Sequence, residues 1–569
     1  MYIIGLHNDE DAGVCLLKDG KILDVINEER LTRKKLHKGF PLRSLDYILK
    51  KNNLKLSDIN YFAYGWHSKK KNFYEYTKKL INRIIECDLK NKKIKDLILE
   101  RLNIEFISDG ETFDKFLKIS KKIGIPEKKI IFLDHHKSHA WSAYACSPFN
   151  KSIVFTMDAR GDLKSSSVSI NDKKLGLREI DHHLSFDSLG FLYGQITYYL
   201  GFTPHKHEGK VTGLAAHGNY RKTLKIFKKL INWNGKRIVS NLGYYRPFFT
   251  NLNKSLKKDL KKFSKEDIAA GLQYHCEDVV SKYVSFWIKK TKMTKKVNIC
   301  LAGGLFANVK INQKISQLKN VQNLYVFPHM GDGGLTVGAA CQLYFLLTKK
   351  NKVELNNVYK GPIYQDSQIL KILKENKNKI SYFKTKNIKK DIHILLEKKF
   401  VIGFFQGRME FGPRALGARS ILFHTKDKNA NKWLNDRLKR TEFMPFAPVT
   451  LDKLASKCFI NWKKNDACSP YMTKTFDCKS DYIKKNPAVV HVDGTARPQV
   501  VKRKFNKLYY DVLSFHFEKT KNNSLINTSF NQHEEPIVCT PQDAISSLLS
   551  NNIDYLVIGN YVVKKRINE

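Results

Sequence analysis

Residues 152–170, SIVFTMDARGDLKSSSVSI, combine an apolar strand, an acidic turn with a glycine, and a second strand. The stretch 2–29, YIIGLHNDEDAGVCLLKDGKILDVINEE, has the same order and carries Asp-Gly at 19–20. Asp-Gly between apolar runs is typical of a β-hairpin. Two similar units in one chain predict a duplicated α/β domain with its ligand cleft between the halves, although two unrelated hairpins are a simpler alternative.

The rest of the chain extends this α/β pattern. Apolar residues spaced three and four apart predict helices over 41–54, 69–102, 188–202 and 266–290. Residues 297–315 and 321–347 each place a glycine turn between a strand and a helix, which lets backbone approach a ligand. The polar, turn-rich stretch 351–362 predicts a boundary, so we expect domains at 1–356 and 357–569.

Length and composition exclude several classes of protein. With 569 residues the chain is too long for one ordinary core. It has no apolar run of about 18 residues, which argues against a membrane-spanning helix, and its first residues lack the regions of a secretory signal. Ten cysteines without a CxxC pair fit a reducing compartment, so we expect a cytoplasmic protein without a disulfide framework or a cysteine zinc site.

The charge balance is strongly basic, at +47. Its lysines are spread along the whole chain and do not alternate with aromatic residues in one block, so we predict a basic surface and no specific nucleic-acid partner. Arginine is concentrated instead, because seven arginines lie between 408 and 503. Arginine binds phosphate or carboxylate through two parallel hydrogen bonds. The segment 408–503 is therefore the candidate anion site.

The string DHHKSHAWSAYA at 134–145 is a candidate metal motif. On a helix, His135 and His139 share one face and suit two imidazole ligands of one metal, while His136 points about 100° away. A third ligand should come from elsewhere. Asp332, in the glycine-bounded turn HMGDGGL, is the best candidate, although it could equally be a helix N-cap. Three satisfied surface or capping histidines are the alternative to a metal site.

The segment QGRMEFGPRALGARSIL at 406–422 carries the sharpest signal. Glycine, proline and arginine at this density predict a tight loop whose amides and guanidinium groups converge on phosphate. Residues 434–440, 491–501 and 525–538 add basic and small polar side chains. Together they predict a nucleotide and anhydride site. The string HEGKVTGLAAHG at 207–218 is a weaker candidate for a cleft loop.

These strings, with EERLTRKKLHKGFP, AGGLFANVKIN, HVDGTARPQVV and LINTSFN, give the chain a resemblance that runs nearly end to end. It resembles the nodulation-type O-carbamoyltransferases, a family that includes tobramycin and cephalosporin carbamoyltransferases. The resemblance implies an N-terminal domain of the actin/hexokinase (ASKHA) type, duplicated, followed by a YrdC-like α/β domain. It also implies that the second domain makes carbamoyladenylate from carbamoyl phosphate and ATP with Mg²⁺, and that the first passes the carbamoyl group to a hydroxyl.

The resemblance also implies site residues. It implies that His135, His139 and Asp332 bind the metal, which is Fe²⁺ or another divalent ion. His136 and Asp11 are candidates for the general base. In the first domain the expected nucleotide or carbamoyl contacts are Asp158, Gly161, Lys210, Gly303, Gly304 and Asn308. In the second domain the expected adenylate and ATP contacts are Arg408, Glu410, Arg414, Arg419, Ser420, Lys439, Arg440, His491, Asp493, Arg497, Asn527, Ser529 and Asn531.

The chain departs from the family pattern at three places. Glu10-Asp11-Ala12 stands where the family has His-Asp-Ala, Phe443-Met444-Pro445 lacks an arginine, and Glu534-Glu535-Pro536 replaces Gly-Glu-Pro. We therefore expect an O-carbamoyltransferase with a sugar-like or secondary-metabolite acceptor. The alternatives are a tRNA-modifying enzyme of the threonylcarbamoyl type, and a binding protein without catalysis. The acceptor, the metal's identity and the oligomeric state do not follow from the sequence.

Overall fold

The computed structural model describes residues 1–66, 69–172, 174–293, 296–440 and 444–566. The chain forms two compact units. The amino-terminal unit comprises residues 1–25 and 38–355, and the carboxy-terminal unit comprises 26–37 and 356–569. Both contain helices and mixed sheets, so the predicted α/β class is confirmed. Among the described helices, none combines the length and apolarity that crossing a bilayer requires.

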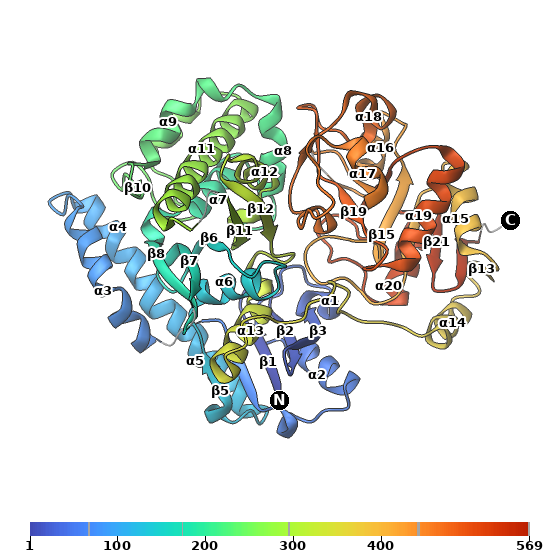
Figure 1. The fold of residues 1–569 in the computed structure, drawn as a ribbon, viewed down its shortest axis with the longest axis horizontal. Coiled ribbons are helices and arrows are strands. Elements are labelled where there is room, and N and C mark those ends of the chain that lie inside the picture. The colour runs from blue at the N-terminus through green and yellow to red at the C-terminus, as the bar shows by residue number, and fades with distance from the viewer. Residues whose placement is uncertain (67–68, 173, 294–295, 441–443, 567–569) are drawn as a thin grey trace. The chain divides into compact units, whose positions relative to one another are not determined.

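The amino-terminal unit contains two five-stranded sheets with the same strand order, β3-β2-β1-β4-β5 and β8-β7-β6-β11-β12 (Figure 1). In each, the third strand pairs antiparallel with the second and parallel with the fourth, which is parallel to the fifth. The strands are β1 (Tyr2–His7), β2 (Gly13–Lys18), β3 (Lys21–Asn27), β4 (Tyr61–Tyr64), β5 (Ile130–Phe132), β6 (Ile153–Gly161), β7 (Lys164–Asp172), β8 (Gly176–Leu184), β11 (Val297–Ala302) and β12 (Val321–Val326).

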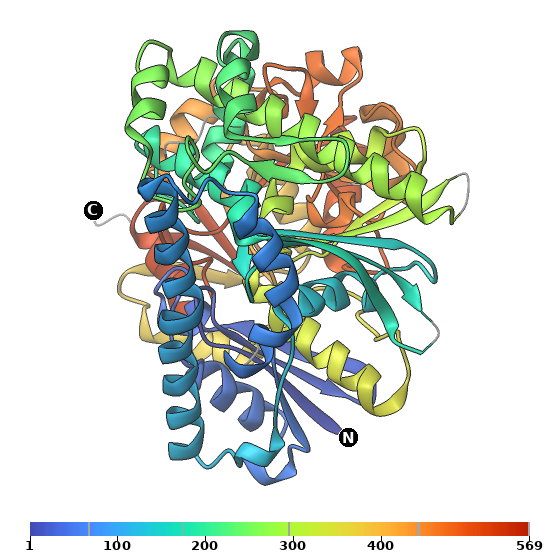
Figure 2. The ribbon, with the colours of Figure 1, turned by 90° about the vertical axis from the view of Figure 1, so that its left-hand side faces the viewer.

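The predicted hairpin turn lies between β2 and β3. Asp19 and Gly20 have φ of 48° and 83°, and positive φ at both central positions is what a tight type I′ hairpin turn requires. The predicted helices are present as α2 (Leu42–Lys51), α7 (Leu189–Tyr199) and α11 (Lys265–Thr291), whereas 69–102 forms two, α3 (Lys69–Ile85) and α4 (Lys92–Asn103). The blue helices in front in Figure 2 belong to this N-terminal part of the chain.

Two buried helices, α6 (His135–Ala145) and α13 (Leu335–Thr348), pack on each other and on both sheets. Glycines permit this close approach. A Cβ at Gly5 of β1 would lie 1.8 Å from the Thr336 carbonyl oxygen, and one at Gly338 would lie 1.9 Å from that of Ser138. The N-termini of α6 and α13 carry the predicted metal motifs, so this packing positions them.

The carboxy-terminal unit is built on a mixed eight-stranded sheet with the order β13-β22-β21-β14-β15-β20-β16-β19. Its strands alternate between two cores, since Ile421 and Phe423 face one and Leu422 faces the other. The strands are β13 (Ile380–Lys384), β14 (Ile402–Phe405), β15 (Arg419–His424), β16 (Ala447–Leu451), β19 (Gln499–Val501), β20 (Leu525–Ser529), β21 (Tyr555–Ile558) and β22 (Tyr561–Lys565). The main helices are α14 (Asp366–Glu375), α15 (Ile388–Glu397), α16 (Ala430–Arg437), α17 (Asp452–Cys458), α19 (Lys507–Thr520) and α20 (Pro541–Leu549).

The division between the units falls between Leu355 and Asn356, but the segment 26–37 belongs to the carboxy-terminal unit. The two units therefore each contain two segments of the chain, whereas the expected domains, 1–356 and 357–569, each contain one. Arg30, in α1 (Glu28–Thr32), donates to the Gly412 carbonyl oxygen at 3.0 Å. Arg33 donates to the carbonyl oxygens of Pro536 and Ile537, both at 2.7 Å. These hydrogen bonds hold an N-terminal segment in the second unit.

Candidate active sites

Four side chains from three elements converge in the amino-terminal unit. His135 and His139 lie one turn apart at the start of α6, Asp158 lies near the end of β6, and Asp332 lies just before α13. His139 Nε2 is 3.2 Å from Asp158 Oδ2 and 3.3 Å from Asp332 Oδ1. His135 Nε2 is 3.7 and 3.8 Å from the same two oxygens. Two imidazoles and two carboxylates thus offer four ligand atoms within 4.8 Å of one another.

The surroundings of this cluster fit a metal ion. Both histidine side chains are fully buried, and within the described part of the chain neither ring nitrogen of His135 has a hydrogen-bond partner. Buried polar atoms are normally satisfied. His135 Nε2, which faces the two carboxylates, is therefore available to a metal ion. A Cβ at Gly161 would lie 2.1 Å from the His135 ring, so the ring needs a glycine there. Asp332 is 29% exposed, which leaves one side of the cluster accessible.

The two histidines of the cluster differ in protonation. Burial lowers the pKa of His135 to about 4, so its ring is neutral at physiological pH, the form that binds metals. Burial acts in the same direction on His139, but the carboxylates of Asp158 and Asp332 outweigh it and raise its pKa to about 9. Burial and the Asp158 charge raise the pKa of Asp332. A metal cation would replace the proton that these carboxylates now hold on His139.

The N-terminus of α6 is held by a buried ion-pair network. The Asp134 side chain accepts from the Lys137 amide, which caps the helix. Lys164 is fully buried and donates to Asp134 at 2.9 Å and to Glu179 at 2.8 Å. Asp162 accepts from the His135 amide at 2.8 Å. This network fixes the first turn of α6 and therefore the two histidines.

The two candidate bases lie in different settings. His136 is buried, and its Nδ1 is 2.8 Å from Thr156 Oγ1, which in turn is 2.7 Å from Ser167 Oγ. Burial holds the pKa of His136 well below its usual value, so its ring is neutral. Asp11 has a φ of 65° in the turn after β1, and its carboxylate is 3.1 Å from His329 Nε2.

Of the other residues predicted in this unit, two glycines lie beside the cluster, and Asn308 and Lys210 belong to helices. Gly303 and Gly304 lie against the end of β6, since a Cβ at Gly304 would lie 3.1 Å from Asp158 Oδ1. Asn308 instead caps α12 (Val309–Gln317) and is hydrogen-bonded to Gln273, so it supports the fold here. Lys210 is buried on α8 (Glu208–Leu214). The glycines therefore belong to the cluster's surroundings, while Asn308 is committed to its helix.

In the carboxy-terminal unit, the arginine-rich loop is organised around Glu410. One of its carboxylate oxygens accepts from the amides of Leu416, Ala418 and Arg419, at 2.6 to 3.3 Å. Ser420 Oγ accepts from the Gly417 amide at 2.9 Å. Glu410 and Ser420 are both buried, so they shape the loop from within.

Arg419, a predicted anion contact, lies inside the unit. Its side chain is fully buried and donates to the carbonyl oxygens of Gln406, Gly407, Ala418 and Pro362. Its guanidinium also stacks on Phe405, at 3.6 Å from the ring centroid. A guanidinium committed to four carbonyl groups holds the loop in place. Arg408 similarly donates to the carbonyl oxygens of Lys360 and Gly361.

A second group of predicted residues meets at the end of β20. Arg440 donates to Thr528 Oγ1 at 2.7 Å, to the Ser529 carbonyl oxygen at 2.7 Å and to Asn531 Oδ1 at 2.8 Å. Asn527 is buried and donates to Gln499 Oε1 at 2.7 Å. One cluster therefore contains Arg440, Ser529 and Asn531. Asn527 instead links β20 to Gln499 of β19 within the sheet.

The remaining predicted residues of this unit are less buried or lie in turns. Arg414 and Arg497 are partly exposed and Lys439 is exposed. Asp493 accepts from the Thr495 amide and hydroxyl and lies 3.5 Å from His491 Nδ1. Of the departures from the family pattern, Met444 is described and Phe443 lies outside the described residues.

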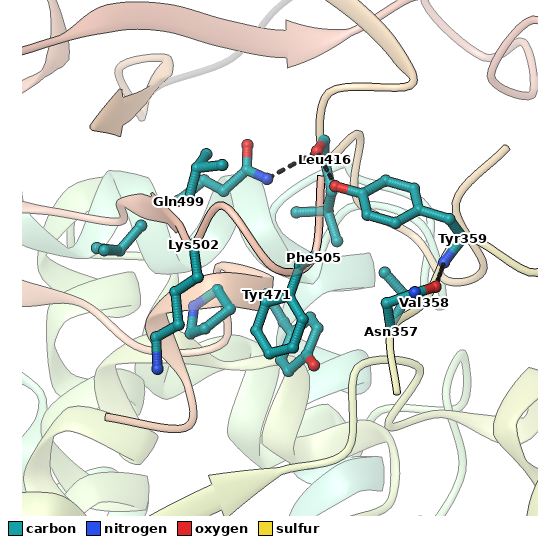
Figure 3. Close-up of a pocket in the computed structure, with 11 residues that line it drawn as sticks. Asn357, Val358, Tyr359, Leu416, Tyr471, Gln499, Lys502 and Phe505 are labelled. Carbon is teal, nitrogen blue, oxygen red and sulfur yellow. Dashed lines mark hydrogen bonds between the residues drawn. The ribbon is translucent and has the colours of Figure 1, made fainter. Parts of the chain in front are cut away.

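A small pocket lies beside the arginine-rich loop (Figure 3). The Leu416 carbonyl oxygen, at its edge, accepts from Tyr359 Oη and from Gln499 Nε2, both at 2.7 Å. Tyr471 and Phe505 form an aromatic wall. None of the predicted anion contacts is among the residues lining it, which include Asn357, Gln499 and Lys502.

Two features of the sites do not follow from the sequence analysis. The sequence predicts Asp158 as a nucleotide contact, and the structure places it among the metal-ligand candidates. The sequence signal for a site residue here is its position at the end of an apolar strand. The buried Lys164 has no such signal, because one lysine among 101 basic residues is not distinctive. Its role follows only from the burial of the carboxylates that it contacts.

Comparisons with known proteins find similarity over most of the chain. The family model "Carbamoyltransferase N-terminus" matches residues 2–341, and "Carbamoyltransferase C-terminus" matches 394–565. "Uncharacterized protein MJ1051" of Methanocaldococcus jannaschii is 33% identical, over 99% of both chains. "Nodulation protein NolNO" of Sinorhizobium fredii is 30% identical, over 98% of this chain and 79% of its own. A solved structure of full-length HypF has 13% identity over 62% of this chain and 47% of its own, with a TM-score of 0.35, too low to assign the fold.

Proposed function

Because the chain belongs to the carbamoyltransferase family, we propose that it is an O-carbamoyltransferase that works in two steps. The carboxy-terminal unit makes carbamoyladenylate from carbamoyl phosphate and Mg²⁺-bound ATP. The amino-terminal unit transfers the carbamoyl group to a hydroxyl of a sugar-like molecule or a secondary metabolite. The observation that carries the proposal is the buried cluster of His135, His139, Asp158 and Asp332, which lies in the segment that the N-terminal family model matches.

For the amino-terminal unit we propose a fold of the actin/hexokinase type, supported by the matching order of its two sheets. His135, His139, Asp158 and Asp332 are the residues that would hold a divalent metal, with iron as the proposed ion. When bound, the metal supplies a Lewis acid that polarises a carbonyl or hydroxyl oxygen. Asp11, held by His329, is the proposed acceptor of the hydroxyl proton, and His136 is the second candidate.

For the carboxy-terminal unit we propose a YrdC-like fold and an adenylating site. Water cleaves carbamoyl phosphate into carbamate and inorganic phosphate. The carbamate then attacks the α-phosphate of ATP, which forms carbamoyladenylate and releases pyrophosphate. The partly exposed Arg414 and Arg497 and the exposed Lys439 offset the phosphate charge. Glu410, Arg419 and Arg440 hold the loops that present them. We also propose a cytoplasmic location, which the ten unpaired cysteines support.

Two variants, one in each unit, test the two steps of the reaction separately. Arg414→Ala should lower carbamoyl-phosphate-dependent exchange of pyrophosphate into ATP by about a hundred- to a thousandfold, because one transition-state contact is lost. His139→Ala should leave this exchange nearly intact and abolish transfer to the acceptor. Arg503→Ala is a matched control, since Arg503 is exposed and pairs with Asp511 at 3.0 Å. If folded His139→Ala loses exchange as completely as Arg414→Ala, the two-step relay is wrong.

A further inference from the structure

A second cluster of metal-binding side chains lies in the carboxy-terminal unit, on two helices that the reaction does not use. It comprises His393 and Glu397 on α15 and His516 on α19. These helices pack on each other over one face of the eight-stranded sheet, and are labelled beside each other in Figure 1. One ligand atom from each of the three residues lies within 4.8 Å of the others.

The two imidazoles are already spaced as metal ligands. His393 Nδ1 is 3.2 Å from His516 Nδ1. Two nitrogens bound to one tetrahedral Zn²⁺ at 2.0–2.1 Å lie about 3.3–3.4 Å apart. A direct hydrogen bond between two neutral rings has a similar length, so this distance alone does not separate the two arrangements.

The third side chain, Glu397, distinguishes a metal site from a hydrogen bond between the two histidines. Glu397 follows His393 by four residues, so both side chains lie on one face of α15. One carboxylate oxygen of Glu397 lies within 4.8 Å of a ring nitrogen of each histidine. A hydrogen bond between two histidines needs no carboxylate beside it, whereas a metal ion takes all three side chains as ligands.

We propose that His393, Glu397 and His516 bind a divalent transition metal such as Zn²⁺, which ties α15 to α19. Two imidazoles and one carboxylate are a usual zinc donor set. Glu397 is exposed, which leaves a fourth position for water. The site is independent of the proposed reaction, because it shares no residue with either step.

The experiment uses the full chain with His135→Ala and His139→Ala, so that the amino-terminal cluster does not contribute. After removal of metal with a chelator, Zn²⁺ is titrated by equilibrium dialysis with elemental analysis. We expect about one Zn²⁺ per chain and a rise in the melting temperature. Adding His393→Gln or the exposed Glu397→Gln should weaken binding by about tenfold or more. His424→Gln, which removes a neighbouring histidine outside the cluster, should not change it.

Two results would overturn the proposal. One is the absence of stoichiometric zinc in the background variant. The other is binding that neither His393→Gln nor Glu397→Gln weakens, since the ion would then lie elsewhere. Glu397→Gln keeps the test decisive if a histidine variant does not fold, because Glu397 lies on the surface of its helix. Neither result bears on pyrophosphate exchange or transfer, so the proposed function stands or falls separately.

Discussion

At the scale of single residues, the amino-terminal cluster depends on a carboxylate that is not part of the histidine motif. Asp158 Oδ2 lies 3.2 Å from His139 Nε2, slightly closer than the Asp332 oxygen at 3.3 Å. Its carboxylate is also largely buried, and its interactions with both histidines hold its pKa well below the usual value against the opposing effect of burial. Asp158 is therefore ionised in the protein and is as well placed as Asp332 to ligate a metal.

We therefore predict that Asp158→Asn lowers the metal affinity of the amino-terminal cluster by at least about 10–100-fold, the loss that even an indirect contact to a ligand produces. His139→Ala should remove about one equivalent of bound metal relative to the wild-type chain. Elemental analysis after dialysis measures both. Asp172→Asn, on the same sheet but outside the cluster, is the control. Undiminished metal in Asp158→Asn would show that Asp158 is not a ligand.

The buried Lys164 gives a prediction about stability. Lys164→Met removes the one buried cation that both Asp134 and Glu179 contact, and breaking a buried ion pair in this way typically costs about 3–5 kcal/mol of unfolding free energy. Denaturant titration of the variant measures this loss. Lys174→Met, at an exposed position of the neighbouring turn, should cost little. A loss no larger than that of the control would show that the network does not hold α6.

The same network predicts a dependence on pH. Burial alone would raise the pKa of Glu179, but Lys164 and the hydrogen bond with His182 lower it to about 2. A lowered pKa means that the stabilisation is complete above the ordinary value near 4.5 and is lost as the pH falls toward 2. The difference in stability between the wild type and Lys164→Met should therefore shrink below pH 4.5. A difference that is constant from pH 6 to 3 would contradict this.

At the scale of elements, the site exists because α6 and α13 approach more closely than ordinary side chains permit. Gly338 of α13 lies against the Ser138 carbonyl group of α6, and a Cβ there would meet backbone that cannot move aside. Asp332 is carried by the N-terminus of α13, three residues before Leu335. A displacement of this helix would therefore move Asp332 away from the two histidines.

We predict that Gly338→Ala lowers stability by about 1–3 kcal/mol, as overpacking a core does, and also weakens metal binding although Gly338 is not a ligand. Thermal unfolding and metal titration on one preparation measure the two effects. Gly209→Ala is the matched control, because a Cβ in that helix would meet no atom of the described residues within 4 Å. Gly338→Ala with unchanged metal affinity would disprove the link between helix packing and the site.

The elements also show what the sequence could predict. Alternating apolar residues and Asp-Gly at 19–20 predicted the first hairpin, and the spacing of His135 and His139 predicted their shared helix face. The segment 26–37 could not be placed this way. Its anchors, Arg30 and Arg33, bond to backbone carbonyl groups more than 380 residues away, and backbone acceptors leave no trace in a sequence. For the same reason the hydrogen bonds from Arg419 to carbonyl groups could not be predicted from the sequence.

At the scale of the whole molecule, the net charge of +47 is the property most open to a second interpretation. Such a charge attracts nucleic acid through its phosphates whatever the sequence, by releasing counterions. A tRNA-modifying enzyme would need more, because recognition requires contacts to shape or to bases. The family models that match the chain describe carbamoyltransferases, which gives no reason to expect such contacts.

We therefore predict that affinity for tRNA is set by salt alone. With six to ten phosphate contacts, binding should fall by about 10³–10⁵-fold between 50 and 200 mM salt. Single-stranded DNA of the same length, which lacks both the tRNA fold and the 2′-hydroxyl groups, should lose affinity in parallel. Filter-binding titrations at several salt concentrations measure both. A nanomolar complex that persists at 200 mM salt with tRNA but not with DNA would mean that the basic surface recognises tRNA, and the hydroxyl acceptor should then be sought on tRNA itself.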